Sequence, residues 1–226
     1  RDSGELFIEH DLAVTHIMCQ LGVDLPTLIA SMLHDSLLPH TGQTVETIRK
    51  NFGEEPAALL EGLEHLHAYA TEPQYQKHRE PGADRKTLEG VRRAVLAIIE
   101  GDIRVILIRM ADCLQDLRKA SNLPQEQRQI IANEAMNIYA PLANRLGIWQ
   151  LKWELEDLAF RYLQPEKYKE IANQLAARRA ERMENINDAV QKLERAIRDN
   201  DLKGTVYGRS KHIFSIYRKM VRKRLD

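Results

Sequence analysis

Residues 28–35 read Leu-Ile-Ala-Ser-Met-Leu-His-Asp, an apolar run that ends in an adjacent imidazole and carboxylate. Its apolar side chains recur with the spacing of one helix face, and Pro26 just before it suits the first turn of a helix. The ring of His34 and the carboxylate of Asp35 can reach one divalent cation together, since nitrogen and oxygen donors suit zinc, manganese or iron. The stretch therefore predicts an apolar helix that ends in two candidate metal ligands.

Two further donors stand elsewhere in the chain, as a complete metal site requires. His10 opens the first expected helix, and Asp112 lies near the middle of an otherwise apolar helix. A carboxylate there is costly to bury unless a cation or a hydrogen-bond donor compensates it. The same residues also allow a structural role, in which His34 caps helix carbonyls and Asp112 pairs with Arg109 or Arg118.

Apolar residues recur at helical spacing along nearly the whole chain, and strand signals are scarce. Helices are expected over 12–21, 26–33, 44–51, 55–69, 85–100, 103–118, 124–146, 151–162 and 165–200. The polar stretch 70–84 lacks periodicity, so it predicts a long surface loop and a candidate lid. After residue 202 a short β-prone segment, 203–208, precedes a basic helix expected over 210–225. The predicted fold class is therefore mostly α, a helical bundle and a helical linker followed by the first strand and helix of an α/β domain.

Composition excludes several classes of protein. The 226 residues are 43% hydrophobic, enough for a sizeable core, and 33 basic side chains balance 33 acidic ones. The balance is uneven, because residues 202–226 carry eight basic groups and one acidic group, so any polyanion site is expected at that end. No stretch is long and apolar enough for a membrane helix. The two cysteines have no C-x-x-C spacing, which suits a reducing, cytoplasmic compartment.

Six segments, in order along the chain, resemble motifs of the RelA/SpoT homologue family. They are 1–10 (RDSGELFIEH), 33–35 (LHD), 102–112 (DIRVILIRMAD), 138–147 (IYAPLANRLG), 152–165 (KWELEDLAFRYLQP) and 207–220 (YGRSKHIFSIYRKM). The block from 138 to 165 is very specific, and the resemblance covers essentially the whole chain. Members of this family make and destroy guanosine tetraphosphate and pentaphosphate.

The resemblance implies an HD hydrolase domain over 1–150, a helical linker over 151–200 and the start of a nucleotidyltransferase-like synthetase domain over 201–226. In the family the hydrolase uses manganese to remove the 3′-pyrophosphate, and the synthetase uses magnesium while it moves pyrophosphate from ATP to GTP or GDP. The implied partners are these nucleotides and, for the whole protein, the ribosome, with no membrane. Because the chain does not begin with Met and its last helical pattern is still running at Leu225, we expect it to be a piece of a longer GTP pyrophosphokinase.

Residue by residue, the resemblance makes His10, His34, Asp35 and Asp112 the manganese ligands, and it makes Arg1 the arginine that packs on the guanine. Five residues of the tail match positions that approach the ATP phosphates: Arg209, Lys211, His212, Ser215 and Lys219. Spacing places Lys211, Ser215 and Lys219 on one face of a helix, and arginine and lysine are the donors that a triphosphate requires. Without the resemblance, a solvated basic helix or weak nucleic-acid binding is the simpler interpretation.

The chain departs from the family where catalysis occurs. Active hydrolases follow the His-Asp pair with a Glu-Asp pair, whereas residues 36–41 here read Ser-Leu-Leu-Pro-His-Thr. Asp116 and Lys119 replace an asparagine and a threonine that hold the nucleotide in the family, and Asp2 replaces a lysine. Loss of a general base or orienting carboxylate commonly slows a reaction by ~10²- to 10⁴-fold. The sequence therefore predicts a degenerate hydrolase that keeps its metal ligands.

Two alternatives stay open. In the first, the domain is an active manganese-dependent guanosine-3′,5′-bis(diphosphate) 3′-pyrophosphohydrolase whose base is supplied by Glu72, Glu80, Asp84 or His40. In the second, it is a non-enzymatic module that senses a nucleotide and regulates the synthetase. Five other histidines are expected at the surface or in loops rather than as ligands: His16, His40, His65, His67 and His78.

Overall fold

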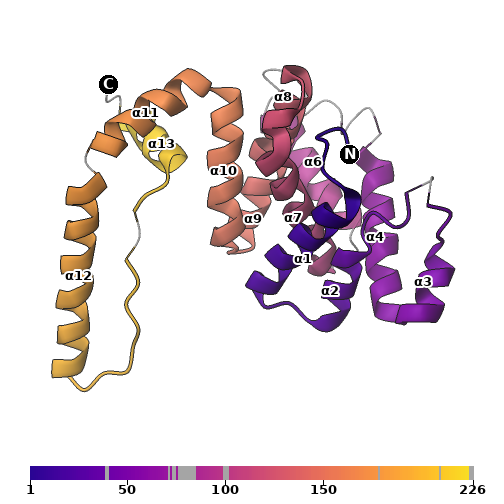
Figure 1. Ribbon diagram of the computed structural model, residues 1–226, viewed down its shortest axis with the longest axis horizontal. Helices are drawn as coiled ribbons and strands as arrows, with labels where there is room; N and C mark the ends of the chain where they lie inside the picture. The colour runs from indigo at the N-terminus through magenta and orange to yellow at the C-terminus, as the bar shows by residue number, and fades with distance from the viewer. Residues whose placement is uncertain are drawn as a thin grey trace. The chain divides into compact units, whose positions relative to one another are not determined.

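The computed structural model describes residues 1–38, 41–70, 72, 75, 85–98, 102–177, 179–208 and 210–223. These residues form helices and connecting segments, divided between two compact units, 1–163 and 164–226 (Figure 1). None of the described helices is both long enough and apolar enough to cross a membrane.

The first unit begins with α1 (Phe7–Leu21), α2 (Leu25–Met32), α3 (Val45–Phe52) and α4 (Glu54–Ala70). It continues with α6 (Arg85–Ile98), α7 (Ile103–Lys119), the 3-10 turn η2 (Ala120–Asn122), α8 (Gln125–Glu134), the π-helical turn η3 (Ala135–Tyr139), α9 (Ala140–Arg145) and α10 (Trp149–Leu163). These elements match the predicted helices closely. The main differences are that α1 begins earlier, so that His10 lies within it, and that the predicted helix 124–146 is divided into three pieces.

The central helix of this unit is α7. It packs against α1, α2, α4, α8 and α10, and ten of its side chains are buried. A helix covered on most sides must be apolar on most sides, which explains its nearly continuous apolar sequence. Asp102 starts the helix, because its carboxylate accepts a hydrogen bond from the backbone N–H of Arg104 at 3.0 Å. Asp112 consequently stands inside the core.

Helix α2 ends just before the predicted His-Asp ligand pair. Asp24 caps its start by accepting a hydrogen bond from the backbone N–H of Thr27 at 3.0 Å, and Pro26 occupies the first turn. The helix stops at Met32, so His34 and Asp35 lie in the turn that follows. Both side chains are buried, and the contacts of α2 with α1, α4 and α7 place that turn beside the central helix.

The π-helical turn η3 has a local cause in the sequence. Pro141 has no N–H to donate to the carbonyl of Asn137, and its ring crowds that carbonyl. The side chain of Arg92 donates to the freed Asn137 oxygen at 2.8 Å. Such turns displace a helix locally and occur often at functional sites. Here the turn ends at Tyr139, whose hydroxyl reaches the polar groups described below.

The second unit consists of α11 (Pro165–Ala177), α12 (Arg179–Asp199) and α13 (Ile213–Lys223). After α12 the chain turns at Asp201, which has a φ of +53°, and runs back along that helix (Figure 1). Gly208 lies so close to α12 that a Cβ there would overlap the side chain of Ile186. Helix α13 then packs against α11.

The mostly α fold class is confirmed, but the strand predicted over 203–208 is not found. This segment has no regular secondary structure. A strand needs a second strand to complete its hydrogen bonds, and none occurs in the described part of the chain. The predicted basic helix 210–225 is shorter, since α13 begins at Ile213. The predicted helix 165–200 is described as α11 and α12, with Arg178 between them outside the described residues.

Candidate metal centre

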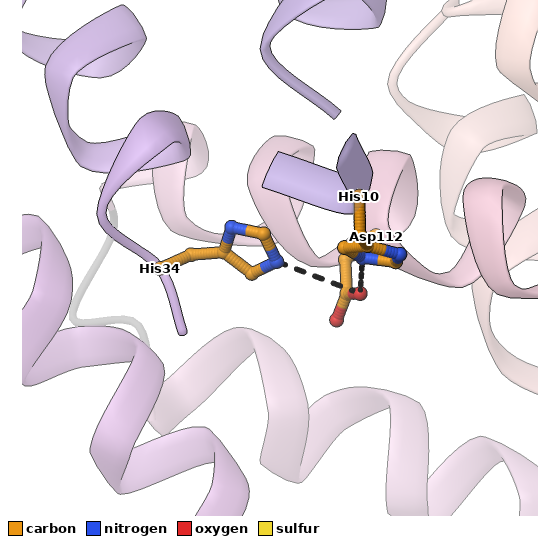
Figure 2. Close-up of side chains that lie close together, drawn as sticks. All are labelled: His10, His34 and Asp112. Atoms are coloured by element: carbon orange, nitrogen blue, oxygen red, sulfur yellow. Dashed lines mark hydrogen bonds and ion pairs between the residues drawn. The ribbon is translucent and has the colours of Figure 1, made fainter. Parts of the chain in front are cut away.

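His10 from α1, His34 from the turn after α2 and Asp112 from α7 meet in the core of the first unit (Figure 2). Nε2 of His10 lies 2.9 Å from Oδ1 of Asp112, and Nε2 of His34 lies 3.7 Å from the same oxygen. All three side chains are buried. Donors bonded at about 2.0–2.2 Å to one tetrahedral ion lie about 3.4 Å from each other. The three donor atoms therefore fit one metal ion.

A backbone carbonyl fixes the ring of His34. Its Nδ1 lies 2.7 Å from the carbonyl oxygen of Ser31, and because a carbonyl can only accept, this nitrogen carries a proton. The opposite nitrogen, Nε2, is buried and has no hydrogen-bond partner among the described residues. Metal-binding histidines are commonly oriented by a hydrogen bond from the second ring nitrogen. The predicted capping role and the predicted metal role of His34 are thus compatible.

Glu5 holds the ring of His10 in a similar way. Its Oε2 lies 3.3 Å from Nδ1 of His10, and its Oε1 accepts a hydrogen bond from Gln115 at 2.8 Å. A carboxylate behind a histidine orients the ring and makes it a stronger metal ligand. The sequence analysis did not identify Glu5, whose only signal is its place shortly before His10.

Asp112 is ionised although it is buried. Burial alone would raise the pKa of Asp112, but the charge of Arg109, a hydrogen bond from His10 and the nearby charge of His34 hold this pKa well below its usual range. Arg109 pairs with Oδ2, which leaves Oδ1 directed at the two histidines. The structural alternative, a pairing of Asp112 with Arg109, is therefore found together with the cluster rather than instead of it.

A further layer of buried polar groups holds Arg109. Its guanidinium lies 3.3 Å from Oε1 of Glu134 and donates to the hydroxyl of Tyr139 at 3.1 Å. The hydroxyls of Tyr139 and Tyr75 donate to Glu134 at 2.9 and 2.7 Å. Buried polar groups stabilise a core only when their hydrogen bonds are made, and this network meets that condition for Arg109.

The carboxylates around His34 favour its protonated form when no metal is bound. Burial alone would lower the pKa of His34, but its interactions with Asp112, and then with Asp35 and Asp11, raise this pKa to about 9. A metal ion would supply the positive charge instead. Metal binding is therefore expected to release a proton.

Asp35, the fourth predicted ligand, lies at the edge of the cluster. Its Oδ1 is 3.7 Å from Nε2 of His34, whereas its Oδ2 pairs with Arg1. Asp11, Asp35 and His34 form a second group of possible ligands. The sequence analysis did not identify Asp11, although its position directly after His10 on α1 is a signal for it.

A cavity of about 510 Å³ opens beside the cluster. Its lining combines the polar side chains of Asp35, Asp112 and Arg109 with the apolar side chains of Leu123, Ile130 and Ile131. Binding cavities commonly combine an apolar lining with a few convergent polar groups. This one can receive a ligand that has both an apolar part and a polar part.

Several residues singled out in the sequence line this cavity. Asp116 does so, and burial together with the charge of Asp112 raises its pKa to about 7. The segment after Asp35 contributes the apolar side chain of Leu38. His67, expected at the surface, is instead half-buried in the cavity wall, and burial lowers its pKa. Of the candidate substitute bases, Glu72 is exposed, while His40, Glu80 and Asp84 lie outside the described residues.

The predicted phosphate-binding residues belong to the second unit. Ser215 and Lys219 lie on α13, but Lys211 and His212 precede it, so the predicted alignment of Lys211 on the helix is wrong. Lys211 and Lys219 are exposed, and Arg209 lies outside the described residues.

Comparison with known families identifies the first unit. The HD domain family matches residues 1–149. The chain belongs to the HD domain family. The matched range contains His10, His34, Asp35 and Asp112 and the whole cavity lining. An HD domain is a metal-dependent hydrolase fold, in agreement with the group of possible metal ligands found in the core.

Curated relatives of this HD domain match the chain along nearly its whole length. A GTP pyrophosphokinase of Photobacterium angustum is 36% identical over 226 residues, which is 100% of this chain and 30% of the relative. The GTP pyrophosphokinase of Escherichia coli K12 is 37% identical over 220 residues, 97% of this chain and 29% of the relative. A probable guanosine-3′,5′-bis(diphosphate) 3′-pyrophosphohydrolase of Synechocystis is 38% identical over 221 residues, 97% of this chain and 28% of the relative.

These names confirm the predicted resemblance to RelA/SpoT homologues. The chain spans about 30% of the length of these relatives.

Proposed function

We propose that this HD domain binds one divalent metal ion and is a degenerate 3′-pyrophosphohydrolase, with little or no turnover of guanosine tetraphosphate. The proposed ligands are His10, His34, Asp35 and Asp112, and the proposed ion is manganese, as the family resemblance implies. One observation carries the proposal: Nε2 of His34 is buried without a hydrogen-bond partner among the described residues and faces Asp112 (Figure 2).

When bound, the ion supplies a Lewis acid and lowers the pKa of a bound water molecule. The residues of this chain have supporting roles. Glu5 and the Ser31 carbonyl orient the two histidines, Arg109 keeps Asp112 ionised, and the apolar part of the cavity receives the base of the nucleotide. Arg1 also lines the cavity, where the family resemblance implies that it packs on the guanine.

The weak step is water activation. The family places a Glu-Asp pair after the His-Asp pair, and this chain has Leu38 in the corresponding segment of the cavity wall. An apolar side chain can neither orient a water molecule nor accept its proton. We therefore expect metal binding to survive and turnover to fall by ~10²- to 10⁴-fold relative to an active homologue.

A second candidate function is a working hydrolase in which Asp116 replaces the missing carboxylate. The observation that favours it is the position of Asp116 in the wall of the same cavity, one turn along α7 from Asp112. Its carboxylate accepts a hydrogen bond from Arg1 at 3.1 Å, so it is held in place.

Pyrophosphate release from guanosine tetraphosphate in manganese buffer distinguishes the two functions. We would compare the wild type with Asp116→Asn and His34→Ala. The degenerate-hydrolase proposal predicts that any release by the wild type is at least ~100-fold slower than by an active homologue and is unchanged in Asp116→Asn. Steady release by the wild type that both variants lack would overturn it in favour of Asp116 as the base.

For the whole protein we infer a GTP pyrophosphokinase that acts in the cytoplasm, with ATP, GTP or GDP and magnesium at its synthetase site and the ribosome as a possible partner. Arg209, Lys211, His212, Ser215 and Lys219 would contribute the beginning of the ATP site. The HD domain would then serve as a regulatory module. Because the chain spans about 30% of its relatives, we expect no pyrophosphate transfer from ATP to GTP by these 226 residues alone.

A further inference from the structure

Arg1 occupies the open side of the candidate metal cluster. Its guanidinium pairs with Oδ2 of Asp35 through one nitrogen, and its other terminal nitrogen donates to Oδ1 of Asp116 at 3.1 Å. The nitrogen that pairs with Asp35 also lies 3.9 Å from Oδ1 of Asp112, the oxygen to which both histidines turn. The side chain is 16% exposed and lies over the ring of Phe7, with 5.7 Å between the guanidinium carbon and the ring centroid.

A guanidinium and a metal ion weaken each other's binding at this place, because both are cations that draw on the same carboxylates. Arginine has five N–H donors and no lone pair to offer, so it can pair with a ligand carboxylate but cannot coordinate an ion. A cation bonded to Asp35 and Asp112 would stand beside the guanidinium, where two positive charges in a partly buried site repel each other. The charged residues that line the cavity are four aspartates and two arginines, so the carboxylates outnumber the arginines by two.

We propose that Arg1 is an internal cation that competes with the divalent metal for Asp35 and Asp112. Without metal, Arg1 neutralises these carboxylates and closes the cluster. Metal binding displaces the guanidinium, which then becomes available in the cavity to a nucleotide. Thermodynamic linkage makes this coupling reciprocal. If metal binding increases the affinity of Arg1 for a nucleotide, a nucleotide that holds Arg1 away from Asp35 increases the metal affinity by the same factor. This inference rests on the proposed metal site.

The chain offers a matched pair of variants for the test. Arg1→Gln removes the charge that touches Asp35, whereas Arg118→Gln removes an equal charge from the last turn of α7, where the guanidinium pairs with Glu154 at 2.7 Å. Manganese affinity of the metal-stripped proteins would be measured by calorimetry, after thermal unfolding has shown that both variants are folded. We expect Arg1→Gln to bind manganese about tenfold more tightly than the wild type, and Arg118→Gln to differ less than threefold.

Equal or weaker binding by Arg1→Gln, while the wild type binds manganese, would overturn the competition and leave the metal site standing. The same gain in both variants would also overturn it, because the effect would then be one of net charge. If neither the wild type nor Arg1→Gln binds manganese, the metal site itself is refuted and the competition with it.

A second measurement needs no variant. Phenylglyoxal modifies accessible arginines, and peptide mapping by mass spectrometry gives the rate for each one. Manganese should raise the modification rate of Arg1 several-fold and leave that of Arg118, which pairs with Glu154 away from the cluster, unchanged. An unchanged or slower modification of Arg1 at saturating manganese would contradict displacement.

Discussion

The ring of His34 donates its Nδ1–H to the carbonyl oxygen of Ser31 at 2.7 Å, and this hydrogen bond decides which nitrogen is left for chemistry. Ser31 lies in the last turn of α2, which stops at Met32, and His34 lies in the turn that follows. The bond holds Nε2 inside the core, 3.7 Å from an oxygen of Asp112. A backbone carbonyl at the end of α2 thus orients His34 so that its Nε2 can bind a metal ion.

Glu5 should control metal affinity although it is not a ligand. Glu5→Gln removes the carboxylate behind His10 and also places an amide against the side-chain amide of Gln115. Loss of such a partner typically weakens metal binding by about 10- to 100-fold. Calorimetric titration with manganese checks this, and Glu9→Gln on the exposed face of α1 is the control. Equal affinity of the two variants would mean that Glu5 does not orient His10.

Glu134 should be important for stability. Its carboxylate is buried and accepts hydrogen bonds from Tyr75 and Tyr139 beside the charge of Arg109. Glu134→Ala removes a partner of that buried charge, which typically costs about 3–5 kcal/mol. Urea unfolding of the metal-free protein measures the loss. The matched change Glu126→Ala, at an exposed position of α8, should cost less than about 0.5 kcal/mol. Similar losses for the two variants would show that the network contributes little.

The contact between α4 and α7 leaves no room for even a methyl group at Gly62. A Cβ there would come within 2.8 Å of Cγ2 of Val105, a buried side chain. Gly62→Ala is therefore expected to destabilise the protein by about 1–2 kcal/mol, despite the better helix propensity of alanine. At Gly90 on α6 a Cβ meets none of the described atoms within 4 Å, so Gly90→Ala should stabilise by about 0.5–1 kcal/mol. Thermal unfolding of both variants checks the opposite signs.

The cap of the central helix should lose its effect in acid. Hydrogen bonds from the side chain and then the backbone of Arg104 lower the pKa of Asp102 below its ordinary value of 3.8. A carboxyl group with a lowered pKa stabilises the fold above its unfolded pKa, and this contribution disappears as the pH falls through the folded value. Asp102→Ala should therefore cost about 1 kcal/mol at pH 7 and much less near pH 2. A cost that does not change between these pH values would exclude the ionised cap.

The helices and the ligands His10, His34 and Asp112 could be predicted from the sequence, because helices leave a periodic apolar pattern and the ligands interrupt it with polar side chains. The apolar run of α7 predicted a buried helix, and Asp112 inside it predicted a compensating partner. Glu5 and Asp11 had only their places beside His10 as signals, and geometry revealed their roles. Geometry alone revealed the half-buried His67, since nothing in its spacing distinguishes it from a surface residue. The strand predicted over 203–208 was wrong because β-propensity describes a segment that has a neighbouring strand to pair with.

The central claim is that the buried histidines and aspartates form a metal site. The most direct test is the metal content of the wild type by elemental analysis after dialysis against manganese, together with His34→Ala and the exposed control His16→Ala. We predict about one manganese ion per chain in the wild type and in His16→Ala, and a loss of nearly all bound metal in His34→Ala. Equal metal contents in all three proteins, or no metal in the wild type, would contradict the assignment of this cluster.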